Sequence, residues 1–261
     1  MAHPLLAPGR KALITGGQQG IGRAVAKQFK ALGMEVCLVD LPGDRLTAAG
    51  EALGVQTEAV DVADQAAMAA LAARLGPLDV LMNNAVTRLG RGFEAPLDDW
   101  QAAFQVNFWG VIHGVEAFLP AMRTQGSGLI INAGSKQGIT NPPGHPIYNA
   151  AKAALKSYTE SLAHELRQGD AAVSVHLLIP GWTMEEGSEK KPGAWSSDQV
   201  GGFMVEALDR GDFYILCPDN DVTSEMDHKR ILWGAQDITE NRPALTRWHP
   251  DWKERATKAC S

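Results

Sequence analysis

Three side chains near the middle of the chain, Ser135, Tyr148 and Lys152, could together move a proton. Residues 147–166 have helical character, and a helix there places Tyr148 and Lys152 one turn apart on a single face. An ammonium group fixed beside a phenol favours the deprotonated phenol, which is a base. The pair therefore predicts a general acid or base, although the same spacing is also common on surface helices.

Ser135 follows an apolar run, residues 128–133, that is typical of a buried strand. Its hydroxyl would emerge at the carboxyl end of that strand, where it could donate a hydrogen bond to a carbonyl oxygen. A hydroxyl, a phenol and a lysine that meet at one place could interconvert a carbonyl and an alcohol. The hydride in such a reaction comes from a cofactor, so the rest of the chain must supply a site for one.

A dinucleotide site is indicated near the amino terminus. A short apolar strand at residues 11–15 runs into a glycine-rich loop, and helical periodicity follows at residues 23–32. Glycines let the backbone approach a pyrophosphate, and the amino end of the helix offers it free amide groups. The residues predicted to bind the cofactor here are Gly16, Gln18, Gln19, Gly20, Ile21 and Gly22. A simple tight turn is the alternative.

Asp40 ends the next strand, residues 35–40, and predicts which cofactor binds. It lies 24 positions after Gly16, close to the spacing at which a carboxylate accepts hydrogen bonds from the adenosine ribose. The same carboxylate would repel a 2′-phosphate, and neither the glycine loop nor Leu41 supplies a basic residue. The sequence therefore predicts NAD in preference to NADP. The alternative is that Asp40 only begins a turn.

Strand-like and helix-like segments alternate along the chain. Further strands are expected at residues 56–60, 78–82, 128–133, 172–179 and 213–217, and helices at 45–53, 64–75, 96–119 and 147–166. This order is typical of a parallel sheet with helices on both faces. We predict one α/β domain over residues 1–261, with a Rossmann-like doubly wound parallel sheet.

Composition excludes several classes of protein. There are 24 lysine and arginine residues against 30 aspartate and glutamate residues, a net charge of −6, which argues against a nucleic-acid partner. No signal peptide or membrane-spanning run is evident, so we expect a cytoplasmic protein that does not bind a membrane. Cys37, Cys217 and Cys260 share no metal-ligand spacing, so reduced thiols and no metal site are expected.

Taken together, the motifs resemble the short-chain dehydrogenase/reductase family over about residues 10–218. The matching motifs are Thr15-Gly16-x-x-x-Gly20-Ile21-Gly22, Asp61-Val62, Asn83-Asn84-Ala85, Asn107, Ser135, Tyr148-x-x-x-Lys152 and Pro180-Gly181. The resemblance implies a sheet of about seven strands and a homo-oligomer, either a tetramer or a dimer. It also implies that Ser135, Tyr148 and Lys152 are catalytic and that Asn107 supports a proton relay through water.

The resemblance also implies further contacts to the dinucleotide. The residues concerned are Leu41, Asp61, Val62, Asn84, Ala85, Tyr148, Lys152, Pro180, Gly181 and Thr183. For Asp61 the alternative is a cap on the segment that follows it. Two positions depart from the family pattern, because Val86 replaces a glycine and Glu185 stands where a threonine often contacts the nicotinamide. Thr183 is expected to make that contact instead.

Residues 182–208 are expected to form a substrate lid, because ligands of open parallel sheets lie beyond the carboxyl ends of the strands. The segment mixes the apolar residues Trp182, Met184, Trp195, Phe203 and Met204 with Glu185, Glu186, Glu189, Lys190 and Lys191. This mixture suggests a hydrophobic or aromatic substrate, although ordinary packing explains it equally well. The residues predicted to contact substrate are Ser135, Tyr148, His145, Trp182 and Trp195. Arg88 and Arg91 could attract an anionic substrate or be surface charges.

A C-terminal extension, residues 223–261, exceeds the expected sheet. A helix is expected at residues 225–237, and Trp248 and Trp252 predict that the tail packs over the lid or against a neighbouring subunit.

The function predicted from the sequence is NAD-dependent interconversion of a secondary alcohol and a ketone of small molecular size. An epimerase or dehydratase of the same family is one alternative, against which the chain length argues. A non-catalytic dinucleotide-binding regulator is the other. The intact set of Ser135, Tyr148, Lys152 and Asn107 argues against a regulator, which does not need a tuned phenol.

Overall fold

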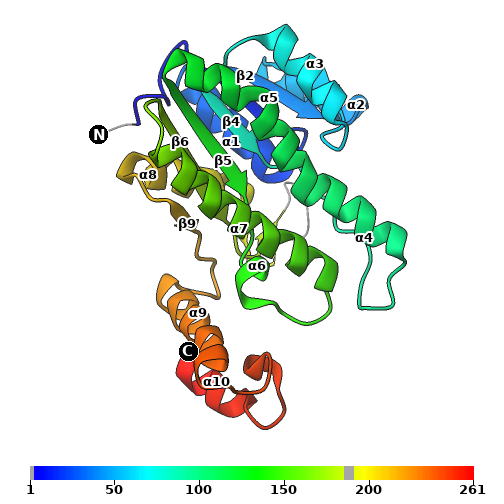
Figure 1. Ribbon diagram of the computed structural model, residues 1–261, viewed down its shortest axis with the longest axis vertical. Coiled ribbons are helices and arrows are strands. Elements are labelled where there is room, and N and C mark those ends of the chain that lie inside the picture. Colours follow the sequence, from blue (N-terminus) through cyan, green and yellow to red (C-terminus); the bar gives the residue numbers. More distant parts are fainter. Residues whose placement is uncertain (1–2, 185–190) are drawn as a thin grey trace.

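A computed structural model describes residues 3–184 and 191–261 of the chain. Its centre is a seven-stranded sheet with the strand order β3-β2-β1-β4-β5-β6-β9, and every neighbouring pair is parallel (Figure 1). The strands are β1 (Lys11–Thr15), β2 (Glu35–Asp40), β3 (Gln56–Ala59), β4 (Val80–Asn83), β5 (Ser127–Ala133), β6 (Ala172–Ile179) and β9 (Tyr214–Leu216). The predicted Rossmann-like doubly wound fold is confirmed, and the strand order reverses between β1 and β4, where such folds bind ligands.

The inner strands are mainly apolar because both faces of the sheet are covered by helices, whereas the edge strand β3 has a polar sequence and no buried residue. Successive side chains point to opposite faces, so Leu13 and Leu81 enter one core cluster while Ile14 and Met82 enter the other. Helices α1 (Gly20–Ala31), α2 (Asp44–Leu53) and α8 (Ser197–Arg210) pack on one face. Helices α3 (Gln65–Leu75), α5 (Gly110–Gln125) and α7 (Pro146–Arg167) pack on the other.

The long helix expected at residues 96–119 is divided. It consists of α4 (Leu97–Phe104), a π-helical segment η1 (Gln105–Trp109) and α5, which continues past Pro120 to Gln125. The helix survives Pro120 because Phe118 and Met122 on the same segment are buried against the sheet. A short helix, α6 (Gln137–Thr140), was not expected from the sequence and lies between Ser135 and α7.

The segment expected to be a lid is only partly separate from the core. A small two-stranded sheet joins β7 (Thr183–Met184) to β8 (Trp195–Ser196). Glu185, Glu186, Glu189 and Lys190 lie outside the described residues. Residues after Ser196 form α8, which packs against α1, and Val200 and Met204 are fully buried there. Residues 197–208, which were expected to belong to a lid, are instead part of the layer that covers the sheet, because the apolar side of α8 is buried there.

The C-terminal extension forms a lobe that projects from the sheet domain (Figure 1, orange to red). It contains α9 (Ser224–Thr239), a 3-10 turn η2 (Thr246–Trp248) and α10 (Lys253–Cys260), and it meets the body of the protein at α6. Trp233 donates a hydrogen bond to Thr246 at 2.6 Å, and the Arg242 guanidinium lies 4.8 Å from the Trp233 ring and 5.1 Å from that of Trp252. The lobe thus has its own small core. Within the described residues, no helix has both the length and the apolar character needed to cross a membrane.

Candidate active site

Tyr148 and Lys152 lie together in the first turns of α7, as their spacing predicted. Pro146 is the first residue of the helix, where its missing amide proton has no cost. The Lys152 Nζ atom is 5.7 Å from the centre of the Tyr148 ring and donates a 2.7 Å hydrogen bond to the carbonyl oxygen of Ala133, the last residue of β5. This bond fixes α7 to the carboxyl end of the sheet.

Lys152 is almost completely buried, with 3% of its surface exposed. Burial, together with a smaller contribution from the nearby charge of Arg88, lowers the pKa of Lys152 to about 7. The ammonium and amine forms are therefore close in free energy at neutral pH. An anion formed nearby, such as a phenolate, would stabilise the ammonium form.

Ser135 lies in the turn between β5 and α6, only two residues after Ala133. Its Oγ atom accepts a 3.1 Å hydrogen bond from the Gln137 amide, and its carbonyl accepts one from Gly138 at 3.0 Å. A Cβ atom on Gly138 would lie 2.5 Å from the Lys152 carbonyl carbon, so only glycine lets α6 lie directly on α7. This contact brings the loop of Ser135 and the helix of Lys152 together.

Asn107 lies in the π-helical segment η1 and is fully buried. Its Oδ1 atom accepts from the Thr87 amide, and its Nδ2 atom donates to the Thr87 carbonyl, both at 2.9 Å. The side chain of Asn107 therefore positions the loop that follows β4. The water of the expected proton relay would have to bind Asn107 in addition to these two hydrogen bonds with Thr87.

The glycine loop is joined to the end of β4. The Asn84 side chain donates to the carbonyls of Thr15 at 3.0 Å and Gly16 at 3.1 Å. Gly16 has a φ of +66°, and a Cβ atom there would lie 2.7 Å from the Ala85 Cα. These contacts hold the loop in a fixed shape beside the first turn of α1.

The amino end of α1 is suited to an anion. It carries no acidic residue in its first turn and no side-chain cap from Gln19. A Cβ atom at Gly20 would meet no atom within 4 Å, so space remains beside the loop. The uncapped amide groups and this space fit the pyrophosphate of a dinucleotide.

Asp40, the last residue of β2, lies beside the glycine loop. Its two carboxylate oxygens accept hydrogen bonds from the amides of Gln18 at 3.1 Å and Leu41 at 2.9 Å. Burial raises the pKa of Asp40, and the two hydrogen bonds oppose this effect. Arg45, in the first turn of α2, also reaches the loop and donates to the Gln19 side chain at 3.2 Å. The sequence reasoning missed Arg45, because only the loop and Leu41 were considered as sources of positive charge.

Asp61 and Val62 follow β3 and have local partners. The Asp61 carboxylate accepts a 2.9 Å hydrogen bond from the Ala63 amide, which corresponds to the capping alternative for this residue. Val62 is buried beneath Gly110, where a Cβ atom would lie 2.7 Å from a Val62 methyl group.

Pro180 and Gly181 bring the end of β6 to the loop of Ser135. The amide of Lys136 donates to the Pro180 carbonyl at 3.3 Å. A Cβ atom on Gly181 would lie 2.5 Å from Asp219 Oδ2 and 2.8 Å from the Lys136 Nζ atom. The Thr183 hydroxyl donates to the Gly181 carbonyl at 3.3 Å, so it lies close to the site but is engaged locally.

Three residues predicted to contact substrate differ in their surroundings. Trp182 is 50% exposed, and His145 immediately precedes α7. Trp195 instead packs edge-on against Phe203, with 5.7 Å between ring centres, next to the core beneath α8. The ring of Trp195 therefore packs within the protein. The sequence alone does not tell an aromatic residue that packs in this way from one that contacts a substrate.

Lys136, Asp219 and Asp227 form a charged cluster that no sequence motif indicated. The Lys136 Nζ atom lies 2.6 Å from an Asp227 carboxylate oxygen and 3.5 Å from one of Asp219, with little exposure of any of the three side chains. The 2.6 Å contact is an ion pair without good hydrogen-bond geometry. Lys136 is 83 positions from Asp219 in the chain, so the sequence offered only a charged residue directly after Ser135 as a signal.

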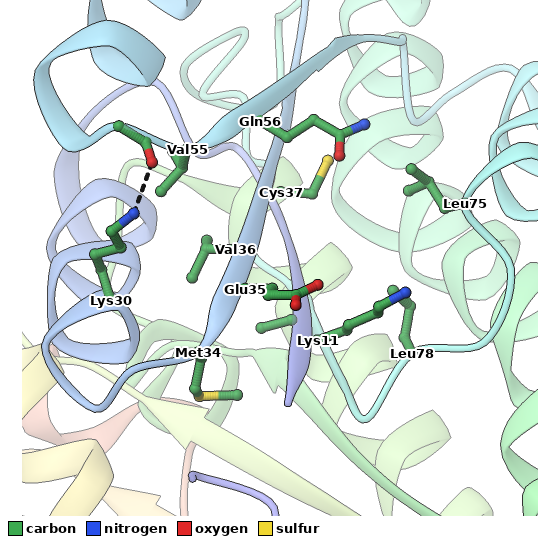
Figure 2. A pocket seen from close by; sticks show the side chains of 12 residues that line it. Lys11, Lys30, Met34, Glu35, Val36, Cys37, Val55, Gln56, Leu75 and Leu78 are labelled. Carbon is green, nitrogen blue, oxygen red and sulfur yellow. Dashed lines mark hydrogen bonds between the residues drawn. The ribbon is translucent and has the colours of Figure 1, made fainter. Parts of the chain in front are cut away.

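A separate cavity of about 320 Å³ lies at the amino-terminal ends of the strands, opposite the ends that carry the candidate site (Figure 2). It is lined by the first residues of three strands, Lys11, Glu35 and Gln56, and Lys30 donates to the Gly54 carbonyl beside it at 2.7 Å. Ser135 and Tyr148 lie beyond the carboxyl end of β5, so this cavity does not belong to the candidate active site.

The chain is similar to known proteins over most of its length. A family model described as short chain dehydrogenase matches residues 10–192. SadH of Mycobacterium tuberculosis is 35% identical over 183 residues, which is 66% of this chain and 66% of SadH. L-xylulose reductase of Bos taurus is 32% identical over 211 residues, 78% of this chain and 83% of that protein. The crystal structure of a short chain dehydrogenase/reductase from Burkholderia phymatum in complex with NAD has a TM-score of 0.77 and 30% identity, and the match covers 90% of this chain and 96% of that chain.

Proposed function

Because this chain belongs to the short-chain dehydrogenase/reductase family, we propose that it is an NAD-dependent oxidoreductase that interconverts a secondary alcohol and a ketone. One observation carries the proposal. Lys152 is buried beside the Tyr148 ring and bonded to Ala133, so a phenol and a buried lysine lie together at the carboxyl end of the sheet, where the glycine loop also lies. A surface helix with the same spacing would leave the lysine in water.

Tyr148 exchanges the proton in this proposal. It removes the proton of the substrate hydroxyl during oxidation and returns it during reduction, and a positive charge on Lys152 stabilises the phenolate. Ser135 donates its hydroxyl proton to the substrate oxygen, and its own bond from Gln137 fixes the orientation of Oγ. Asn107 holds the loop after β4 against the site and contributes to the path of the proton to solvent. The nicotinamide, when bound, supplies the site that accepts or donates the hydride.

The family uses a nicotinamide cofactor, and we propose the following contacts for it. The glycine-loop residues hold the pyrophosphate at the amino end of α1. Asp40 and Leu41 bind the adenosine ribose, and Asp61 and Val62 lie beside the adenine. The remaining residues line the nicotinamide half: Asn84, Ala85, Tyr148, Lys152, Pro180, Gly181 and Thr183. Asp40 favours NAD, whereas Arg45 beside Gln19 would favour the additional phosphate of NADP.

The proposed substrate is a small molecule with a hydrophobic or aromatic body. Exposed apolar side chains on the loops after β4 and β6 support this, since Val86 is 50%, Leu89 39% and Trp182 50% exposed. Ser135, Tyr148, His145 and Trp182 are the proposed contacts, while the packing of Trp195 on Phe203 argues against a direct role. We further propose that the protein is a cytoplasmic homo-oligomer, a dimer or a tetramer.

The test is a panel of secondary alcohols and ketones, monitored at the absorbance of the reduced nicotinamide with NAD and NADP in parallel. Tyr148→Phe should lower kcat by at least ~100-fold, the lower end of general acid–base contributions, and should leave NAD affinity nearly unchanged. A variant that keeps most of its rate would contradict the assignment of Tyr148. Hydride transfer without net change of cofactor would instead favour an epimerase or dehydratase, and binding without turnover would favour a regulator.

A further inference from the structure

Arg88 lies directly over the candidate catalytic tyrosine. Its guanidinium carbon is 5.0 Å from the centre of the Tyr148 ring. The backbone that carries it is fixed, because the preceding residue, Thr87, is held at both its amide and its carbonyl by Asn107. Arg88 is exposed, so its charge is open to a ligand from solution while it lies over the Tyr148 ring.

The charge of Arg88 is not paired with a carboxylate in the part of the chain that the structure describes. Asp99 approaches the same loop, where a Cβ atom on Gly90 would lie 3.1 Å from its carboxylate, but it does not pair with Arg88. Lys136, which follows Ser135 in the chain, is already neutralised by Asp219 and Asp227.

Two like charges therefore meet at this site. The field of Arg88 reaches Lys152, where it disfavours the ammonium form. An unpaired guanidinium beside a buried lysine raises the free energy of the site unless an anion enters it. The exposed guanidinium, the fixed backbone and the lack of a pairing carboxylate within residues 3–184 and 191–261 together point to an anionic ligand that comes from solution.

We propose that Arg88 binds the carboxylate of the substrate, and that the substrate is a hydroxy acid or oxo acid with an apolar body. The proposal rests on the proposed oxidoreductase function and specifies its substrate class. A guanidinium pairs with a carboxylate through two parallel hydrogen bonds, which would orient the reacting carbon toward Tyr148. A phosphate carries about two charges and three acceptor oxygens. Among the described residues, Arg88 brings a single guanidinium to the Tyr148 ring, and exposed apolar side chains at Val86 and Leu89 flank it in the chain, so a carboxylate fits better.

The first experiment compares acids with their uncharged esters. The 2-hydroxy and 3-hydroxy isomers of phenylpropanoate, and the methyl ester of each, are oxidised with NAD by the full-length protein and its variants. Arg88→Gln should lower kcat/KM for at least one acid by ~10-fold or more, equivalent to about 1.4 kcal/mol, and change kcat/KM for its ester by less than about 2-fold. Arg88→Lys should recover part of the loss, because lysine keeps the charge but not the planar fork. Arg123→Gln, at an exposed arginine in the last turn of α5, is the control and should leave both rates unchanged.

The second experiment needs no turnover. Binding of 3-phenylpropanoate and of 3-phenylpropanamide to the NAD-saturated protein is measured by calorimetry. Arg88→Gln should weaken the carboxylate by ~10-fold or more and leave the amide unchanged. The affinity for NAD itself is measured in the same variant and should not change.

Several results would overturn the proposal. Equal losses for acids and esters would mean that Arg88 supports Tyr148 rather than the substrate. A loss confined to NAD affinity would mean that its anion is a cofactor phosphate. Equal binding of the carboxylate and the amide by wild type would exclude a carboxylate site. If no compound in the wider panel is turned over but the carboxylate still binds through Arg88, the oxidoreductase proposal fails and the anion site stands.

Discussion

The Nζ atom of Lys136 lies 2.6 Å from Oδ2 of Asp227, which joins the residue next to Ser135 to the first turns of helix α9. The contact is almost dry, with 14% of the lysine side chain and 4% of the aspartate side chain exposed. It is the link through which the C-terminal lobe can affect the active site, because α9 meets the body of the protein at α6.

Asp227→Asn should therefore destabilise the protein and disturb Ser135. The substitution leaves the Lys136 ammonium with the more distant Asp219 as its remaining carboxylate, which should lower the free energy of unfolding by about 1–3 kcal/mol. Chemical denaturation measures this loss, and KM should rise more than kcat falls if Ser135 is displaced. Glu225→Gln, on the exposed side of the same helix, is the control and should lower the free energy of unfolding by no more than about 0.5 kcal/mol, because its ion pair with Lys229 is exposed. An unchanged denaturation midpoint in Asp227→Asn would show that the ion pair contributes nothing.

The buried Lys152 should make stability depend on pH. Burial, with a contribution from Arg88, lowers its pKa to about 7 from 10.5, so between these values the unfolded chain holds a proton that the folded protein has lost. The free energy of unfolding of the cofactor-free protein should therefore rise between pH 7 and 9, by at most ~1.4 kcal/mol per pH unit, relative to Lys152→Met. Denaturation midpoints of both proteins at pH 7, 8 and 9 measure the difference. Parallel pH profiles would mean that Lys152 has an ordinary pKa.

The denaturation measurements should not extend above pH 9, because the titration of two buried thiols changes the free energy of unfolding in the opposite direction to that of Lys152. Burial raises the pKa of Cys37 and of Cys217 to about 12 from 9.0. Above pH 9 the unfolded chain loses these protons first, which lowers stability as pH rises. The comparison with Lys152→Met removes their contribution, since both proteins contain the same thiols.

Two glycine substitutions should have opposite effects. In Gly138→Ala the new Cβ would lie 2.5 Å from the Lys152 carbonyl carbon, so α6 must move away from α7, and stability should fall by about 1–3 kcal/mol together with kcat. In Gly202→Ala, within α8, the new Cβ meets no atom within 4 Å and should raise stability by up to ~1 kcal/mol without changing kcat. Thermal unfolding and steady-state rates measure both. A Gly138→Ala variant that is as stable and active as wild type would show that the close packing of α6 is not needed.

Asp40 and Arg45 should pull cofactor choice in opposite directions. The ratio of kcat/KM for NAD to that for NADP should fall by at least ~10-fold in Asp40→Ala, because the carboxylate that repels a 2′-phosphate is removed. It should rise in Arg45→Gln, because the cation that bonds Gln19 at the loop is removed. Steady-state kinetics with both cofactors measure the ratio. If the ratio moves in the same direction in both variants, the two charges do not compete for one phosphate position.

Much of the fold and part of the site could be predicted from the sequence. Apolar runs such as residues 128–133 indicate strands buried on both faces, and the glycines that follow β1 indicate a tight loop that the backbone of a ligand-binding site can use. The pair of Tyr148 and Lys152 could be placed as well, since residues four apart on a helix are neighbours whatever surrounds the helix. These features depend on a few successive residues, so local spacing was enough to determine them.

Only the tertiary structure shows which side chains of the candidate site are already held by other residues of the protein. Asn107 is held by Thr87, and Trp195 packs on Phe203, so neither role could be read from residue type. The same is true of α8, which covers α1 rather than the active site. The contact of Arg88 with Tyr148 depends on how the loop after β4 packs against α7, two segments that are distant in the chain. Burial and charge pairing arise only from that packing, because a side chain's surroundings in a fold come mostly from residues far away in the sequence.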